Sequence, residues 1–593
     1  MLSRTSLPGL LAVALSITGA LLPSSASSAA TACRQDQEVH VWTAPLRPQP
    51  GDPLDVLAVS TDGALDQVQV TAPDGQRSVL RTDGTGGPPW GLAGSLSRPR
   101  TGTYRIEALR GGRVAACTEI RVGGGEAERG SGEWDLATSA LYAVWIERLF
   151  DAPPAQSLSY DSLAPVLRNA ERNFLHGYLG AGEDERLPAE PDCADLPYFL
   201  RAYFAWKLGL PVAYRPCSRG SRTSPPTCQG PVIDTALTGA PASAAAFKAV
   251  TRRLMDTVHS GTGRTALGSE STDFYPVPLK RSAIWPGTLY ADPYGHVLVV
   301  VKWIDQRPGQ PGLLLAVDAQ PDNSVARKRF WEGTFLFANT PSAGPGFKAF
   351  RPLVRTGGGW HQLSNGNLGA GTGLPPYATE QGGLAPDDFY ARMQRLINPQ
   401  GLAPEAASEA TLEALVEQVR TRVDSVAKGE GYMRAHPGTV IPMPSGPAIF
   451  ETIGPWEDFA TPSRDMRLLI AMNVLAGLPE RIRRYPDLYT LRGMRPSEAA
   501  DRIERRQAQR LNEEYVTYTR SDGSPARLSL RDLYDRRAGL EVAYNPNDCV
   551  ERRWGAAQGT ADFATCRRQA PADQRVRMEE YRPWFREARR PPR

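Results

Sequence analysis

PDCADLPYFLRAYFAWKLGLP, residues 191–211, is the most informative segment of this chain. Asp192 is a residue type that caps helix N-termini, and Gly209 is the type that ends helices. The bulky apolar residues at 194–208 between them predict a buried helix. Cys193 then stands in the first turn, where the helix dipole and free backbone N–H groups favour the thiolate form. Those N–H groups are also suited to stabilise an oxyanion.

A thiolate nucleophile needs a base, and the base needs a group that orients it. The chain has six histidines, and His296 differs from the others because it opens the apolar strand predicted at 297–304. The next apolar run, LLLAV, leads into Asp318 at the far end of an expected antiparallel neighbour. We therefore predict Cys193 as nucleophile, His296 as base and Asp318 as the orienting carboxylate. Gln320 is a rival for the orienting role.

Each of these residues also has a purely structural interpretation. Cys193 would then be a buried thiol or part of another disulfide, and His296 a hydrogen-bonded histidine at a strand end. Asp318 would be an ordinary turn residue. Pro197 falls where the first helical turn closes and lacks the N–H that would bond the carbonyl at or next to Cys193, so we expect a distorted turn there.

The seven cysteines support the choice of Cys193, because local pairing leaves it over. One expected pair brackets the first domain, one closes a Pro/Ser-rich loop and one closes a loop near the C-terminus. These pairs are Cys33 with Cys117, Cys217 with Cys228, and Cys549 with Cys566. Cysteines of exported proteins tend to pair, so the unpaired thiol is a candidate reactive group.

The N-terminus predicts export to the periplasm or the extracellular space. Residues 1–32 have a short positive region, an apolar stretch at 7–22 and a small-residue cleavage pattern ending at Ala32, as in a signal peptide. Cleavage there places Cys33 first, as in a bacterial lipoprotein. However, Ala30 stands where the lipobox has Leu, which disfavours lipid anchoring. No later stretch has the roughly 20 apolar residues of a transmembrane span.

The pattern along the chain predicts a multidomain protein. Residues 33–124 show short alternating runs between turn signals, which favour an all-β, immunoglobulin-like sandwich. Residues 130–372 mix helical and strand patterns and predict an α+β core, with TFLF at 334–337 among its strands. Residues 385–593 are charged and carry apolar residues three and four apart, so we expect a mainly α domain.

The central motifs resemble two enzyme families. The run from Cys193 through GLP at 209–211 to Arg215 resembles the nucleophile helix of transglutaminase-like enzymes. GHV at 295–297 is similar to the His strand of NlpC/P60 peptidoglycan peptidases. Both families belong to the papain-like superfamily, so the resemblance, which covers about 190–320, implies that the α+β core at 130–372 is papain-like. Pro197, the long loop before His296 and the lack of an aromatic residue after it depart from these families.

The sequence therefore predicts a secreted cysteine peptidase or amidase that transfers the acyl group of peptide amides, with peptidoglycan peptides as the expected substrate. An amine acceptor in place of water makes the same site a transglutaminase-like acyltransferase. The main alternative is a non-catalytic envelope scaffold with a degenerate transglutaminase-like core. A third interpretation is a wall-binding module whose sandwich binds glycan.

Composition narrows the expected partners and cofactors. The chain of 593 residues has 68 basic and 64 acidic side chains, so its formal charge of +4 gives no general affinity for nucleic acid. It shows no metal-ligand spacing, phosphate-binding loop or serine nucleophile elbow. We therefore expect neither a cofactor nor a metal ion, and the oligomeric state is left open.

Overall fold

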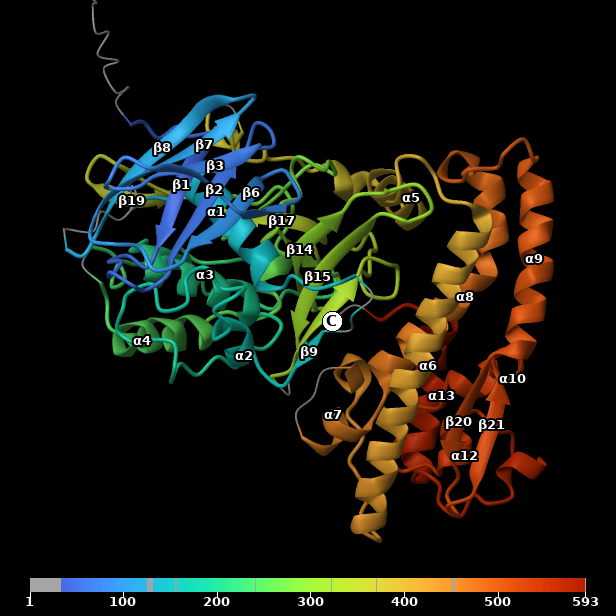
Figure 1. The fold of residues 1–593 in the computed structure, drawn as a ribbon. Helices are drawn as coiled ribbons and strands as arrows, with labels where there is room; N and C mark the ends of the chain where they lie inside the picture. Colours follow the sequence, from blue (N-terminus) through green and yellow to red (C-terminus); the bar gives the residue numbers. More distant parts are fainter. Residues whose placement is uncertain are drawn as a thin grey trace, which may run out of the picture.

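The computed structural model of the chain describes residues 33–591, apart from 125–131, 155, 157, 240, 321–322, 370 and 451–453. The signal peptide predicted for residues 1–32 lies outside the described residues. Figure 1 shows a β-rich N-terminal part, a central part built on a larger sheet, and a mostly helical C-terminal part. At this level the prediction of a multidomain chain with antiparallel sheets and a helical C-terminal region is confirmed.

The N-terminal part consists of two four-stranded antiparallel sheets that share one core. Their strand orders are β1-β2-β6-β5 and β4-β3-β7-β8. The strands are β1 (Val39–Ala44), β2 (Leu54–Ser60), β3 (Gln67–Thr71), β4 (Arg77–Leu80), β5 (Thr82–Thr85), β6 (Trp90–Leu96), β7 (Gly102–Arg110) and β8 (Arg113–Val122). Val56 of one sheet and Ile106 of the other are fully buried in the shared core, as alternating strands require.

The central part is built on a seven-stranded antiparallel sheet of order β12-β17-β13-β14-β15-β16-β9. Its strands are β9 (Ser159–Tyr160), β12 (Phe274–Pro276), β13 (Leu289–Ala291), β14 (Val297–Ile304), β15 (Leu313–Ala319), β16 (Val325–Arg329) and β17 (Gly346–Phe350). β14 and β15 are antiparallel neighbours, as their apolar runs predict.

The strand predicted at 334–337 is wrong. These residues form a loop, in which Phe335 is fully buried and its ring lies 4.9 Å from that of Tyr290 and 4.8 Å from that of Phe330. The apolar run covers one face of the sheet instead of joining its edge. Periodicity alone does not separate these two uses of a short apolar run.

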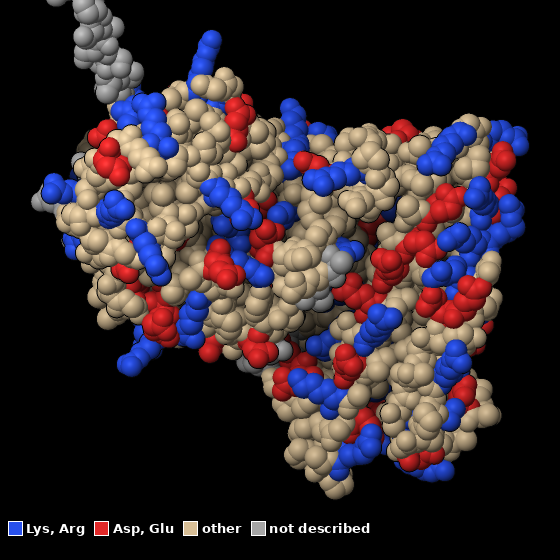
Figure 2. All heavy atoms as spheres, in the orientation of Figure 1, with Lys and Arg blue, Asp and Glu red and all other residues tan. Residues whose placement is uncertain are grey.

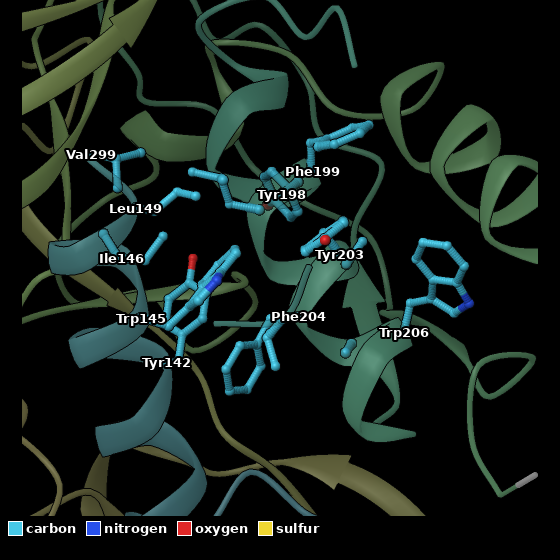
Figure 3. Close-up of a cluster of buried hydrophobic side chains, with 14 of the residues drawn as sticks. Tyr142, Trp145, Ile146, Leu149, Tyr198, Phe199, Tyr203, Phe204, Trp206 and Val299 are labelled. Carbon is cyan, nitrogen blue, oxygen red and sulfur yellow. The ribbon is translucent and has the colours of Figure 1, made fainter. Parts of the chain in front are cut away.

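The opposite face of the sheet holds the helix that follows Cys193. Helices α1 (Leu136–Leu149) and α3 (Asp195–Leu208) pack there in one aromatic cluster with Val299 of β14 (Figure 3). The rings of Trp145 and Tyr203 stack with centroids 5.8 Å apart, and the Trp145 indole N–H donates to Asn173 Oδ1 at 2.8 Å. Burial of each such side chain contributes roughly 1.5–3 kcal/mol, so α3 is held rigidly.

Shorter elements connect this core to the rest of the chain. They are α2 (Ala164–Leu167), β10 (Val212–Tyr214), β11 (Val232–Asp234), α4 (Ala244–Met255), β18 (Leu353–Thr356), β19 (Gly359–Gln362), α5 (Pro386–Ile397) and the 3₁₀ turns η1 (Thr262–Arg264), η2 (Asn365–Asn367) and η3 (Glu380–Gly383). The N-terminal sheet β1-β2-β6-β5 also packs on this core, because Leu57 and Val59 of β2 lie in the same cluster as α1.

The C-terminal part is mainly helical around its own core. Its elements are α6 (Pro404–Ala435), η4 (Gly446–Phe450), α7 (Pro455–Phe459), α8 (Pro462–Arg484), η5 (Pro486–Leu488), α9 (Pro496–Glu513), β20 (Tyr515–Thr519), β21 (Pro525–Ser529), α10 (Leu530–Asp535), α11 (Arg537–Leu540), α12 (Val550–Arg553), η6 (Ala561–Phe563) and α13 (Ala572–Arg586). The hairpin β20–β21 was not predicted; its run YVTYT is rich in residues that favour strands.

The charges of the helical part are largely paired. Arg502 and Arg506 of α9 form ion pairs with Glu405 and Glu409 of α6, and Figure 2 shows cations and anions intermixed over these helices. This arrangement gives no continuous cationic surface there. None of the described helices combines the length and apolar character needed to cross a bilayer.

Candidate active site

Cys193 lies in a turn at the start of α3 and carries the one free thiol among the described cysteines. Asp192 Oδ1 accepts hydrogen bonds from the N–H groups of Ala194 at 2.7 Å and Asp195 at 3.0 Å, as an N-cap does. The Asp192 carbonyl accepts from Leu196 N–H at 2.9 Å. The regular helix begins only at Asp195, because Pro197 has no N–H for the Cys193 carbonyl. At the far end Gly209 ends α3 with φ 72°, as predicted.

The capping bonds correct one expectation about the oxyanion site. The N–H groups of Ala194 and Asp195 are both taken by the Asp192 carboxylate, so neither is free for a substrate oxygen. The N–H of Cys193 itself donates to no other residue in the described part of the chain. Among these three N–H groups, the one left without a partner in the described residues is therefore that of Cys193, and a free backbone N–H beside a nucleophile is suited to stabilise an oxyanion.

His296 is held in a tight turn between β13 and β14. Asp292 Oδ1 accepts hydrogen bonds from the N–H groups of Tyr294 at 2.7 Å and His296 at 2.9 Å. The Asp292 N–H donates to the His296 carbonyl at 3.0 Å and closes the turn. Sequence reasoning missed Asp292, although the run Asp-Pro-Tyr-Gly is a turn signal that could have identified it.

The structure brings His296 and Asp318 together. His296 Nε2 lies 3.0 Å from Asp318 Oδ2, and the Asp318 side chain is almost completely buried near the end of β15. Cys193 also lies close enough to the His296 ring to act on its pKa. Because Nε2 faces Asp318, the ring nitrogen left for Cys193 is Nδ1. The structure thus brings the three predicted residues into one site.

The charge states follow from these contacts. Burial alone lowers the pKa of His296, but the hydrogen bonds to Asp318 and Cys193 outweigh it and raise that pKa to about 10. Burial alone raises the pKa of Asp318, but the hydrogen bond from His296 and the charges of Lys328, His296 and Arg467 lower it overall. The site therefore favours an imidazolium beside an ionised carboxylate.

Gln320 and Asp195 take supporting positions. Gln320 Nε2 donates to Asp318 Oδ2 at 2.7 Å, so it contacts the carboxylate and has no hydrogen bond to His296. Asp195 follows the nucleophile turn, where burial and the charges of Asp192 and Asp256 raise its pKa to about 8. The sequence gives no signal for this shift, because its largest cause is the burial of the Asp195 carboxyl in the folded chain.

The other six cysteines pair as the sequence predicts. The three pairs at disulfide distance are Cys33 with Cys117, Cys217 with Cys228, and Cys549 with Cys566. A residue outside the Cys217–Cys228 loop also contacts it: His259 Nε2 lies within hydrogen-bond distance, 2.9 Å, of the Cys217 carbonyl oxygen. These pairs fit an exported protein.

One group of side chains in the described residues has the proximity that a metal site needs, namely Cys549, Glu551 and Cys566. Its chemistry does not fit a metal ion, because the two cysteines form a disulfide. The Glu551 oxygens also accept hydrogen bonds from Ser521 and Thr565. The group is therefore a hydrogen-bonded structural cluster.

Comparison of the chain with models of protein families, with curated proteins and with solved structures finds no match. The geometry of Cys193, His296 and Asp318 is therefore the basis on which a function can be assigned.

Proposed function

We propose that this protein is an exported cysteine hydrolase that transfers the acyl group of peptide amides, with Cys193 as nucleophile. The observation that carries the proposal is the connected set of side chains at the start of α3. The free thiol of Cys193 lies close enough to His296 to act on its pKa, and His296 Nε2 lies 3.0 Å from Asp318 Oδ2. This arrangement is what nucleophilic catalysis by a thiolate requires.

In the first step, Cys193 Sγ attacks the amide carbonyl and the Cys193 N–H stabilises the oxyanion. The C–N bond then breaks, and His296 gives its proton to the leaving amine. The product of this step is a thioester. A water molecule attacks it, His296 accepts the water proton, and the C–S bond breaks to release the acid. The proton on His296 restores the starting imidazolium–thiolate pair.

Asp318 stabilises the imidazolium and fixes the ring, in the way a buried carboxylate orients a catalytic histidine. An amine in place of water yields a new amide by the same steps. The predicted export makes peptides of the cell wall the proposed natural substrate. Purified wall material and generic peptide amides are the substrates to test first, and lack of turnover on both would argue against a hydrolase.

The finer fold assignments are part of this proposal. Two four-stranded sheets around one core support an immunoglobulin-like sandwich over 33–124. The packing of α3 against an antiparallel sheet that carries His296 and Asp318 supports a papain-like core over 130–372. The helical domain is proposed to cover 385–593.

The decisive test is labelling of the native, non-reduced protein with iodoacetamide from about pH 4 to about pH 9, read by peptide mass spectrometry. We expect label on Cys193 alone among the seven cysteines. His296→Gln should slow the reaction, whereas the exposed His436→Gln should leave the rate unchanged. An inert Cys193, or a profile insensitive to His296→Gln, would favour the scaffold interpretation.

A further inference from the structure

The C-terminal part of the chain places two arginines beside the candidate site. Arg467 lies in α8, close enough to Asp318 for its charge to lower the pKa of that carboxyl. Arg590 follows α13, and its guanidinium lies close enough to Asp292 and Arg467 for both charges to act on it. Figure 1 shows this end of the chain between the central and C-terminal parts.

Arg590 is held in place without a counter-ion. Its Nη2 donates to Ser463 Oγ at 2.8 Å, and its guanidinium carbon lies 4.7 Å from the centroid of the Phe450 ring. Its Nε is buried and donates to no residue. Burial and the like charge of Arg467 lower the pKa of Arg590 to about 10, against the opposing effect of Asp292. A buried guanidinium N–H without an acceptor is costly, and an anion relieves that cost.

Among the described residues, no carboxylate forms an ion pair with these cations. Within the described residues, Arg467, Arg590 and the nearby Lys328 form no ion pair. The closest acids have other partners: Asp292 accepts from two backbone N–H groups, and Asp318 binds His296. Two guanidinium groups that repel each other beside a candidate site therefore have donor capacity for a ligand.

There is also space for a ligand on this side. A cavity of about 490 Å³ lies between the central and C-terminal parts. Tyr294, two residues before His296, lines it together with Ile470 and Val474 of α8 and with residues 587–589, which lead into Arg590. Figure 2 shows the surface hollowed between these two parts. The C-terminal part thus forms one wall of a recess that borders the His296 turn.

We infer that Arg467 and Arg590 bind a carboxylate of the substrate, so that the site acts on amides that carry an acidic group near the scissile bond. This inference rests on the proposed function and adds the substrate class to it. A guanidinium pair binds a carboxylate through charge-assisted hydrogen bonds, and the partly buried position reduces screening by salt. The helical C-terminal part then takes a direct part in substrate recognition.

The test compares two alkylating reagents of similar size, the anionic iodoacetate and the neutral iodoacetamide, on Cys193 of the full chain. We expect the iodoacetate-to-iodoacetamide rate ratio to exceed that of free cysteine by about tenfold at low salt, and to fall as salt is added. Arg467→Gln and Arg590→Gln should each lower this ratio at least about threefold, and because both reagents attack the same thiol the ratio cancels any effect of the substitution on the thiol itself. Arg483→Gln, which removes one exposed charge from the same helix, is the matched control and should leave the ratio unchanged.

The outcomes separate this inference from the proposed function. If iodoacetamide labels Cys193 but the ratio equals that of free cysteine and does not respond to Arg467→Gln, the inference is wrong and the catalytic proposal stands. If neither reagent labels Cys193, both are wrong. Arg590→Lys keeps the charge and should retain most of the ratio. Arg467 donates no hydrogen bond within the described residues, so its replacement tests the inference even where Arg590→Gln disturbs folding.

Discussion

His296 Nε2 lies 3.0 Å from Asp318 Oδ2, and the same carboxylate oxygen accepts a hydrogen bond from Gln320 at 2.7 Å. The carboxylate, and not the amide, is therefore the group that contacts the imidazole. The Gln320 amide holds this carboxylate in place through its hydrogen bond to Oδ2. Of the two residues that the sequence offers as the group that orients His296, Asp318 therefore takes this position and Gln320 does not.

Replacement of Asp318 by Asn should lower the pKa of His296 from about 10 toward its ordinary value, because the paired negative charge is lost. We expect the iodoacetamide rate of Cys193 at about pH 6 to fall at least about tenfold. Gln320→Ala leaves the carboxylate in place and should change the rate less than about threefold. Imidazole NMR titration and labelling kinetics measure the two effects. A larger loss in Gln320→Ala than in Asp318→Asn would show that the amide orients the ring.

Glu147 links the N-terminal sheets to α1, because its Oε1 accepts a hydrogen bond from Gly86 N–H at 3.2 Å. Burial raises its pKa to about 7, although Lys302 at 3.7 Å opposes the shift. An acid with a raised folded-state pKa stabilises the fold below its unfolded pKa, here about 4.5, and loses that contribution as the pH rises through 7.

The expected loss between these pH values is of order 3 kcal/mol. Glu147→Gln should remove this pH dependence from the thermal unfolding midpoint of the part that contains α1. The exposed Glu413→Gln, far along the chain in α6, is the control and should leave the dependence intact. Equal pH dependence in wild type and Glu147→Gln would contradict the assignment.

Gly209 ends α3 in the left-handed region, with φ 72°. The N–H of Leu210, the next residue, donates to the carbonyl of Ala205 in the last turn of the helix at 2.9 Å. A Cβ at this φ costs about 1–2 kcal/mol, so Gly209→Ala should lower the thermal midpoint. Gly209→Asn should lower it less, because Asn tolerates this conformation. Gly230 has no positive φ and open space around its Cα, so Gly230→Ala is the matched control and should be close to neutral.

Most of the candidate site could be predicted from short sequence patterns in residues 191–211 and around His296. The cap at Asp192, the stop at Gly209 and the strand after His296 are each encoded by a few neighbouring residues, and all three recur in the structure. The odd cysteine count identified Cys193 because the six other cysteines pair locally.

What the sequence did not predict depends on contacts between distant segments. The capping bonds of Asp192 consume two N–H groups that a helix start alone would leave free for an oxyanion. The approach of Arg467 and Arg590 to the site requires the C-terminal part to fold back onto the central sheet, and no local pattern encodes that. The TFLF run failed as a strand because its partner is a sheet face, not a strand edge.

The C-terminal part contains a buried ion pair that tests how its core is held together. Arg422 Nε and Nη2 donate to the two Asp465 oxygens at 2.9 and 3.0 Å, and both side chains are essentially inaccessible. Asp465→Asn leaves the guanidinium charge buried without a counter-ion and should cost about 3–5 kcal/mol. The exposed pair of Arg395 with Asp487 has similar geometry, but Asp487→Asn should cost less than about 1 kcal/mol because solvent screens it. Chemical denaturation of the two variants, followed by the fluorescence of Trp554 against which Arg422 packs, compares the costs directly. Similar small losses in both variants would mean that the Arg422 charge is satisfied by other groups, and the Ala543 carbonyl at 3.4 Å is the first of these to examine.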